Sequence, residues 1–317
     1  MTEPRGQRAR RYLPRALSEE QATALVGSKA ESLPVTQISP GTVVCDAHTE
    51  EPILGYFSLR DAARLRRAVL TIDTTTGVQR QSNYRSKSRT FGYAPRRPVV
   101  RRESCQLTSL GRDHPEVERV LEDYADQFSD MLVEIDPAIV PRDIATLGPL
   151  LRDWRIGEAK LWTSGVVNDT ATLPYHRDGF NFPTWSAMPV LRRGIRGGGL
   201  HLPEYGLVVP CADATVTLFQ GQRFVHGVTP MTRVRPKEGY RISIVYYALK
   251  GMKNCREAAE EAAYGSKRRT EREIDMARRL AAGDRSIPGN TDPIGALKRM
   301  HGSLAREGFN PENGTAR

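Results

Sequence analysis

The chain has 317 residues, of which 39% are apolar and 26% are charged, and it carries a formal net charge of +10 with a pI near 9.6. No apolar run approaches the roughly 20 residues needed to cross a bilayer, and the N-terminus lacks the apolar stretch of a secretory signal. We therefore expect a cytoplasmic, intracellular protein without membrane contact. The positive charge favours a polyanionic partner, but charge alone does not identify one.

The four cysteines (Cys45, Cys105, Cys211 and Cys255) are far apart in the sequence and form no Cys-x-x-Cys pair. That spacing disfavours zinc-ribbon and redox motifs. Because disulfides are rare in reducing compartments, we expect four free thiols.

The N-terminal half indicates a basic arm followed by short helices. Residues 1–17 are basic, and we expect a mobile arm. The run Ser18-Glu19-Glu20-Gln21 resembles a capping box that opens a helix ending near residue 29. Apolar spacing predicts a second helix over residues 58–69. We expect residues 18–157 to form a helical and basic part that packs on the core.

A basic segment spans residues 80–102 and contains no acidic residue. Its eight cations are interleaved with Tyr84, Phe91 and Tyr93. Cations neutralise phosphates and aromatic rings stack on unpaired bases, so the segment suits nucleic acid, although a solvated loop would have the same composition. The residues that we assign to phosphate contacts are Arg85, Lys87, Arg89, Arg96 and Arg97.

The pattern changes from helical to strand-like along the rest of the chain. Apolar residues recur at helical spacing over 115–135, and Pro115 suits a first turn. Residues 158–254 form short β-like runs separated by Gly and Pro, which predicts a sandwich or barrel. The expected strands are 160–167, 173–178, 187–192, 199–202, 214–219, 223–228 and 241–249. Residues 255–317 read as a charged helical extension, in which Gly265 could interrupt the helix.

Two histidines and one carboxylate follow the order His176-x-Asp178…His226. Residues two apart on a strand point to the same face, so His176 and Asp178 can converge on one ion, and His226 can join them from a partner strand. Two histidines and a carboxylate form the facial triad of non-haem Fe(II) oxygenases, which leaves open positions on the metal. A zinc hydrolase could use the same three ligands.

Arg241 lies in a strand-like run with bulky residues on both faces, which predicts an internal strand. A buried arginine needs an anionic partner, and its planar fork can hold a carboxylate through two hydrogen bonds. The distal carboxylate of 2-oxoglutarate would be such a partner. His201 falls in the same β region, where we expect it to be a bystander.

The motif His176-x-Asp178, Gly198-Gly199-Leu200-x-Leu202-Pro203, Asp213, His226-Gly227-Val228-x-Pro230 and Arg241-x-Ser243 resembles the catalytic core of the TET/JBP family. These are Fe(II)- and 2-oxoglutarate-dependent dioxygenases that oxidise the 5-methyl group of pyrimidines in nucleic acid. The resemblance covers about residues 158–249. It implies an α+β fold in which helices flank a double-stranded β-helix, or jelly-roll, core over 158–254.

The resemblance also implies roles for individual residues. His176, Asp178 and His226 would bind Fe(II), Arg241 would hold 2-oxoglutarate, and O2 would be the oxidant. Asn168 and Ser243 are further candidates for cosubstrate contacts. DNA would be the partner, with the target base flipped out of the duplex. Three aromatic residues follow the first two ligands and would pack against that base or belong to the core: Phe180, Phe182 and Trp185.

Departures from the family leave the substrate open. The chain has neither the cysteine-rich zinc-binding region of animal TET enzymes nor an evident modified-base-binding domain, so it resembles a minimal member of microbial or phage type. The base would be 5-methylcytosine or thymine. A dioxygenase acting on a protein or small molecule, and a non-catalytic DNA-binding β module, remain alternatives.

Overall fold

The computed structural model describes residues 8–74, 77–79, 85–97, 102–284, 309–310 and 315–316, with the backbone alone at 77–79, 85–86, 309–310 and 315–316. Within the basic segment, Arg80, Tyr84, Arg101 and the side chain of Arg85 thus lie outside the described residues. The chain divides into two compact units. Residues 1–94 and 107–254 form the core unit, and residues 95–106 and 255–317 form the second unit.

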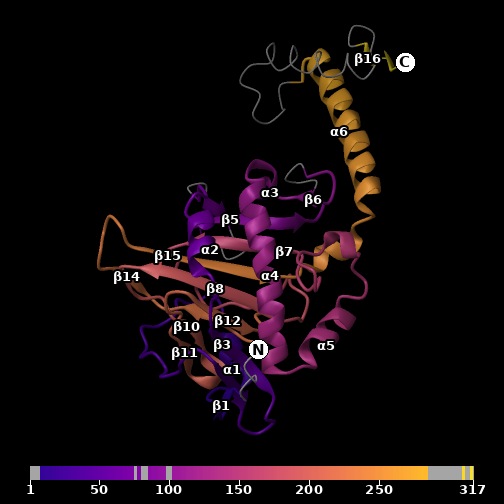
Figure 1. Cartoon of the computed structure of the whole chain (residues 1–317). Coiled ribbons are helices and arrows are strands. Elements are labelled where there is room, and N and C mark those ends of the chain that lie inside the picture. The colour runs from indigo at the N-terminus through magenta and orange to yellow at the C-terminus, as the bar shows by residue number, and fades with distance from the viewer. Residues whose placement is uncertain are drawn as a thin grey trace. The chain divides into compact units, whose positions relative to one another are not determined.

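The core unit is built on a large, mostly antiparallel sheet (Figure 1). Along its strand order the edge pair β1 and β2 is parallel and each following pair is antiparallel. In sheet order the strands are β1 (Ala9–Leu13), β2 (Thr42–Asp46), β3 (Pro52–Ser58), β12 (Thr215–Phe219), β8 (Ser186–Arg193), β15 (Tyr240–Tyr247), β7 (Ser164–Asp169), β5 (Arg85–Ala94) and β4 (Gly77–Gln79).

One face of this sheet is covered by helix α4 (Pro115–Ile135) (Figure 1). The apolar stripe of α4 packs against inward-facing strand residues such as Ile244 and Tyr246 in one buried cluster. Tyr246 is fully buried and donates a hydrogen bond from its hydroxyl to the Leu121 carbonyl at 2.8 Å. The predicted helix over 115–135 is confirmed, because its period-3.6 stripe matches the apolar face of the sheet.

The opposite face of the sheet is covered by a small sheet of β11 (Leu207–Val209), β10 (Leu200–Leu202) and β13 (Gly227–Val228). Leu200 and Leu202 pack there against Val190 and Phe219 of the large sheet. Two sheets therefore enclose an interior between them, as in a jelly roll. The strands β9 (Ile195–Gly197) and β14 (Met231–Arg233) form a separate antiparallel pair.

The N-terminal part contributes more strand than its sequence suggested. Its first two helices are short: α1 (Glu19–Ala24), which carries the expected capping box at Ser18, and α2 (Ala62–Val69). Strands β2, β3 and β5 from the same part belong to the large sheet. β2 and β3 were missed because their residues are buried on both faces and show no period-two alternation. The remaining helices of the core unit are α3 (Ser109–Asp113), α5 (Ile139–Thr146), η2 (Arg152–Trp154), η3 (Pro203–Tyr205) and η4 (Lys250–Asn254).

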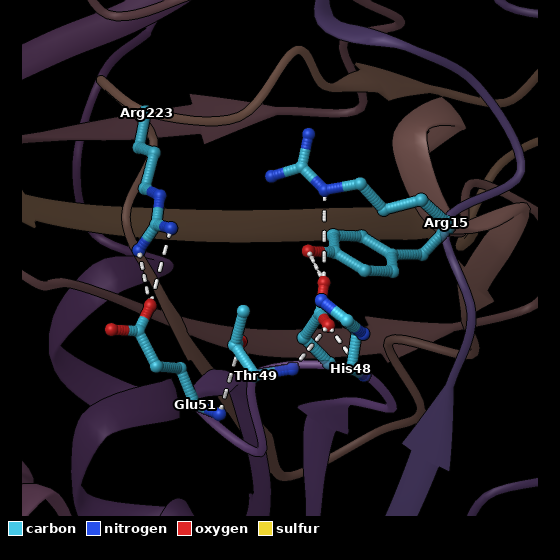
Figure 2. A network of polar contacts seen from close by, with 7 residues as sticks. Arg15, His48, Thr49, Glu51 and Arg223 are labelled. Atoms are coloured by element: carbon cyan, nitrogen blue, oxygen red, sulfur yellow. Dashed lines mark hydrogen bonds and ion pairs between the residues drawn. The ribbon is translucent and has the colours of Figure 1, made fainter.

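The buried Asp46 carboxylate ties the turn between β2 and β3 to η3. Asp46 accepts hydrogen bonds from the backbone N–H groups of His48 and Thr49 and from the Tyr205 hydroxyl, and Arg15 lies 3.6 Å away. These contacts lower the pKa of Asp46 to about 2, and the Thr49 N–H is the largest cause. Glu51, at the same turn, pairs with Arg223 (Figure 2).

The second unit contains α6 (Ala258–Ala281), which runs through Gly265 without a break. The expectation of four free thiols is wrong. Cys105 and Cys255 form a disulfide with Cα atoms 5.8 Å apart, within the range that a disulfide spans. A separation of 150 residues hides that proximity in the sequence. No described helix is long and apolar enough to cross a membrane.

The second unit also contains a buried carboxylate that is hydrogen-bonded and ion-paired. Glu261 of α6 is 0% exposed and accepts hydrogen bonds from the backbone N–H groups of Cys105 at 2.8 Å and Arg256 at 2.9 Å. The Arg96 guanidinium pairs with the same carboxylate at 2.7 Å. Arg96 and Arg256 both lie over the Tyr264 ring. This cluster fastens α6 to the strand-like residues around Arg96.

Candidate metal centre

The three predicted ligands meet in the core unit. His176 Nε2 lies 3.7 Å from Asp178 Oδ1, and His226 Nε2 lies 4.0 Å from Asp178 Oδ2. The two imidazole ring centroids are 4.2 Å apart, and one ligand atom from each residue lies within 4.8 Å of the others. Two imidazole nitrogens and a carboxylate oxygen at this spacing can share one divalent transition-metal ion and leave coordination positions open.

Backbone pairing holds the ligands together, although not through the strand expected over 173–178. His176 and His226 form an isolated antiparallel bridge, with N–H to carbonyl distances of 2.9 and 3.0 Å. Asp178 donates its backbone N–H to the Gly221 carbonyl at 3.0 Å instead of continuing a strand. The prediction of a strand over 173–178 is therefore wrong. The backbone bridge at His176 and the hydrogen bond from Asp178 to Gly221 are sufficient to bring the two side chains to the same point.

Both histidines present the same ring nitrogen to the centre. Nδ1 of His176 is 2.8 Å from the Pro174 carbonyl, and Nδ1 of His226 is 3.0 Å from the Phe224 carbonyl. If Nδ1–H donates to these carbonyls, the lone pair of Nε2 faces the shared point. Burial and, to a smaller extent, the neighbouring His176 lower the pKa of His226 to about 4. His226 is therefore neutral near pH 7, as a metal ligand must be.

Gly221 leaves room for the carboxylate ligand and was missed by sequence reasoning. A Cβ atom at this position would lie 2.4 Å from Asp178 Oδ2 and 3.4 Å from His226 Cε1. A side chain at this position would therefore displace Asp178 from the centre. A single glycine in a turn carries no distinguishing signal in one sequence, so only the structure could identify it.

Arg241 is a buried cation whose guanidinium has no partner in the part of the chain that the structure describes. It lies on β15, is 1% exposed, and none of its three guanidinium nitrogens has a hydrogen-bond partner among the residues that the structure describes. Leaving a buried charge unpaired costs several kcal/mol. Gly198 approaches closely, since a Cβ there would lie 2.9 Å from Arg241 Cδ. The side chain is thus packed in place, and its guanidinium is available to an anion.

Two predicted polar residues share the face of Arg241. Ser243 is two residues further along β15, and Asn168 of β7 lies directly opposite Ser243. Both are buried, at 6% and 2% exposure. Val190, also opposite Ser243, belongs to the same buried cluster as Phe219, whose ring packs edge-on to His226 at 5.0 Å. The metal centre and the guanidinium therefore border the same interior between the two sheets.

Among solved structures, NgTET1 in complex with 5mC DNA is similar to this chain at 18% sequence identity and a TM-score of 0.51, over 72% of this chain and 83% of that one. An oxidoreductase of the 2OG-Fe(II) oxygenase family from Burkholderia pseudomallei aligns over 62% of this chain and 88% of that one, at 16% identity and a TM-score of 0.40. No protein-family model and no curated protein matches the sequence. The chain has a TET-like oxygenase fold. The expected α+β class with a jelly-roll core is confirmed.

The three aromatic residues that follow the ligands occupy different environments in this TET-like fold. Phe180 is 51% exposed, only two residues past Asp178. Phe182 is buried and donates its backbone N–H to the Ala248 carbonyl. Trp185 belongs to the cluster beneath α4, on the far side of the sheet from the interior. Phe180 is therefore the aromatic residue of the three that remains accessible beside the centre.

The basic segment contains both exposed and paired cations. Arg89 forms an ion pair with Asp113 at 2.6 Å. Arg96 is held by Glu261 in the second unit. The side chains of Lys87 and Arg97 are exposed. Sequence reasoning could not separate the two groups, because each carboxylate partner lies 24 or 165 residues from its arginine.

His201 is a buried histidine outside the centre. Its Nδ1 lies 2.6 Å from the Tyr175 hydroxyl, and the two rings pack edge to face. Burial lowers the pKa of His201. It has a hydrogen-bond partner from its own chain, as expected for a bystander.

Proposed function

We propose that this chain is an Fe(II)- and 2-oxoglutarate-dependent dioxygenase that hydroxylates the 5-methyl group of a pyrimidine in DNA. The observation that carries the oxygenase part is the guanidinium of Arg241, which is buried in the interior that the triad borders and has no hydrogen-bond partner among the described residues. A metal hydrolase or a structural metal site would leave that guanidinium without a partner. A dicarboxylate cosubstrate supplies one.

The residues present fit the iron and its cosubstrate. His176, Asp178 and His226 offer the donor set of a facial triad. Gly221 leaves the space that the carboxylate ligand occupies. Fe(II), when bound there with 2-oxoglutarate and O2, supplies the oxidising power to hydroxylate a methyl group.

The protein itself would hold 2-oxoglutarate, orient the imidazoles and exclude water. Arg241 would fix the distal carboxylate of 2-oxoglutarate through its fork, and the neighbouring Ser243 and Asn168 would offer further hydrogen bonds. Apolar side chains such as Val190 and Leu200 line the interior and exclude water from it. The backbone carbonyls at Nδ1 keep both imidazoles oriented.

A base in DNA is the proposed substrate for two reasons. NgTET1, whose fold this chain shares, was solved with 5mC DNA. The exposed ring of Phe180 beside Asp178 offers a surface on which a flipped base can stack. The net charge of +10 favours a polyanion in general. The candidate reactions are 5-methylcytosine to 5-hydroxymethylcytosine and thymine to 5-hydroxymethyluracil.

The deciding experiment incubates the protein with Fe(II), 2-oxoglutarate and duplexes that contain 5-methylcytosine, or thymine without methylated cytosine. Succinate is quantified and the nucleosides are identified by mass spectrometry. We expect DNA-dependent succinate and a hydroxymethylated nucleoside, both absent from Asp178→Ala. Succinate formation that DNA leaves unchanged would favour a protein or small-molecule substrate. A folded protein that forms no succinate in any mixture would contradict the dioxygenase proposal.

A further inference from the structure

A buried carboxylate reaches both backbone segments that carry the metal ligands. Glu204 lies in η3 and is 2% exposed. Its Oε1 accepts the backbone N–H of Val225 at 2.8 Å, immediately before His226. We propose that Glu204 is a positioning residue that fixes the geometry of the metal ligands. This inference rests on the proposed function, since it concerns the same centre.

Arg177 links the same carboxylate to the other two ligands. It lies between His176 and Asp178 and points away from the centre, with its NH2 group 3.6 Å from Glu204 Oε1. Its NH1 group is 3.5 Å from the exposed Glu19 carboxylate. One oxygen of Glu204 therefore contacts the residue before His226 and attracts the residue between the other two ligands.

Two buried polar atoms of the Arg177–Glu204 pair, Arg177 Nε and Glu204 Oε2, have no hydrogen-bond partner within the described part of the chain. The Glu204 side chain is 2% exposed and the Arg177 side chain 24%, so removal of Arg177 would leave the buried Glu204 carboxylate without its cation. The position of each side chain therefore depends on the other.

The helix that carries Glu204 is itself anchored. The backbone carbonyl of Glu204 accepts N–H groups from Ala16 at 2.8 Å and Leu17 at 3.4 Å. The adjacent Tyr205 donates its hydroxyl to Asp46 at 2.8 Å. The Glu204 carboxylate is consequently held from the N-terminal segment and from the large sheet, which makes it a fixed reference for the ligand segments.

A second ion pair near His226 is weaker. Arg223 contacts Glu51 at 3.3 Å (Figure 2), but their side chains are 46% and 55% exposed. Exposed pairs contribute between zero and about 1 kcal/mol. We therefore assign the positioning of the His226 segment to Glu204 rather than to Glu51.

The chain offers a closely matched control in Glu118. This carboxylate is 5% exposed, accepts a single backbone N–H from Gly92 at 2.6 Å, and has a second oxygen without a partner among the described residues. It belongs to α4, on the outer face of the large sheet. Its burial and its single backbone hydrogen bond match those of Glu204, but among the described residues it forms no ion pair and no hydrogen bond to a ligand segment.

The test is the dissociation constant for Co(II), measured by calorimetry on the full chain without cosubstrate or DNA. Groups that orient metal ligands typically contribute about 10- to 100-fold to metal affinity. We expect Glu204→Ala to weaken Co(II) binding by that factor. Glu204→Gln should weaken it by roughly three- to tenfold, because the amide oxygen still accepts the Val225 N–H but no longer attracts Arg177. Glu118→Gln and Glu51→Gln should bind like the wild type.

Thermal melting separates positioning from folding. A Glu204→Gln protein that melts cooperatively and binds Co(II) as tightly as the wild type would overturn the inference, whether or not Glu204→Ala folds. Equal weakening in Glu204→Gln and Glu118→Gln would also overturn it, since the effect would then not depend on contact with the ligand segments. If the wild type itself fails to bind Co(II), the metal centre and hence the proposed function fail first.

Discussion

Two fully buried charges of opposite sign show how differently a protein can treat a charge in its interior. Glu261, in the second unit, is surrounded by two backbone N–H groups and the Arg96 guanidinium. Arg241, in the core unit, has no hydrogen-bond partner for any guanidinium nitrogen among the described residues. Both are at most 1% exposed.

The difference distinguishes a charge that stabilises the fold, as at Glu261, from a charge that is available to bind a ligand, as at Arg241. A buried charge with all of its partners stabilises the local fold, and removing it leaves those partners unpaired. A buried charge without partners destabilises the empty protein, and it persists where a ligand completes it. Substitutions at the two sites should therefore have opposite consequences for stability and for ligand binding.

The largest effect on stability is expected at Glu261, the buried charge that has protein partners. Glu261→Ala removes the acceptor of three donors and deprives the partly buried Arg96 of its carboxylate, so the second unit should lose roughly 3–5 kcal/mol of stability. Hydrogen exchange of the α6 amides measures this loss directly. Glu260→Ala, at the exposed neighbouring position, is the control. Unchanged exchange in Glu261→Ala would show that the cluster does not hold the helix.

At Arg241 the change should appear in binding rather than in folding. Arg241→Met removes two charge-assisted hydrogen bonds to the dicarboxylate, so the Kd for 2-oxoglutarate should rise by about 100-fold or more. The free energy of unfolding without ligand should stay the same or increase, because an unpaired buried charge disappears. Calorimetry and urea denaturation measure the two quantities. The exposed Arg60→Met serves as the control, and a Kd within twofold of the wild type would contradict the proposed role.

Glu118 is intermediate between Glu261 and Arg241, because its buried carboxylate accepts a single hydrogen bond, from the Gly92 N–H. Burial raises its pKa to about 7, so the folded protein holds the proton more tightly than the unfolded chain does. Stability from this group is present below pH 4.5 and is lost as the pH rises through 7. Glu118→Gln should therefore be more stable than the wild type at pH 8, by up to roughly 3 kcal/mol. Melting curves from pH 5 to pH 8 should converge at the acidic end, and a constant difference would contradict the assignment.

The sequence predicted that the candidate ligands come together and that Arg241 is buried, but it did not predict the partners of Glu261. Iron chemistry restricts the candidate ligands, two of which lie only two positions apart, to a few residue types, and bulky residues on both faces of its strand indicate that Arg241 is internal. Nothing comparable links Arg96 to Glu261, or Cys105 to Cys255, because those pairs are separated by 165 and 150 residues. Long-range partners depend on the complete fold, so paired cations in the basic segment could not be distinguished from exposed ones.

A smaller effect on stability is expected at Asp46, and it should depend on pH in the opposite direction to the effect at Glu118. The folded pKa is lowered to about 2, so its contribution is present above pH 4 and is lost as the pH falls towards 2. Asp46→Asn should cost roughly 2 kcal/mol at neutral pH, because the charged acceptor of the Thr49 and His48 N–H groups is replaced by a neutral one. The difference from the wild type should shrink in melts performed between pH 4 and pH 2. A difference that does not change over that range would exclude the carboxylate charge as its source.

The smallest effect concerns the cations of the basic segment that remain exposed. Arg89 and Arg96 already hold carboxylates, which leaves Lys87 and Arg97 as the better candidates for binding phosphates. Neutralising one cation that binds a phosphate should lower the slope of log affinity against log salt by about one. Lys87→Gln with Arg97→Gln should therefore reduce the slope by about two, whereas Arg60→Gln should leave it unchanged. A slope that the double substitution leaves intact would exclude these two side chains from the DNA interface and reassign the segment to a solvated surface.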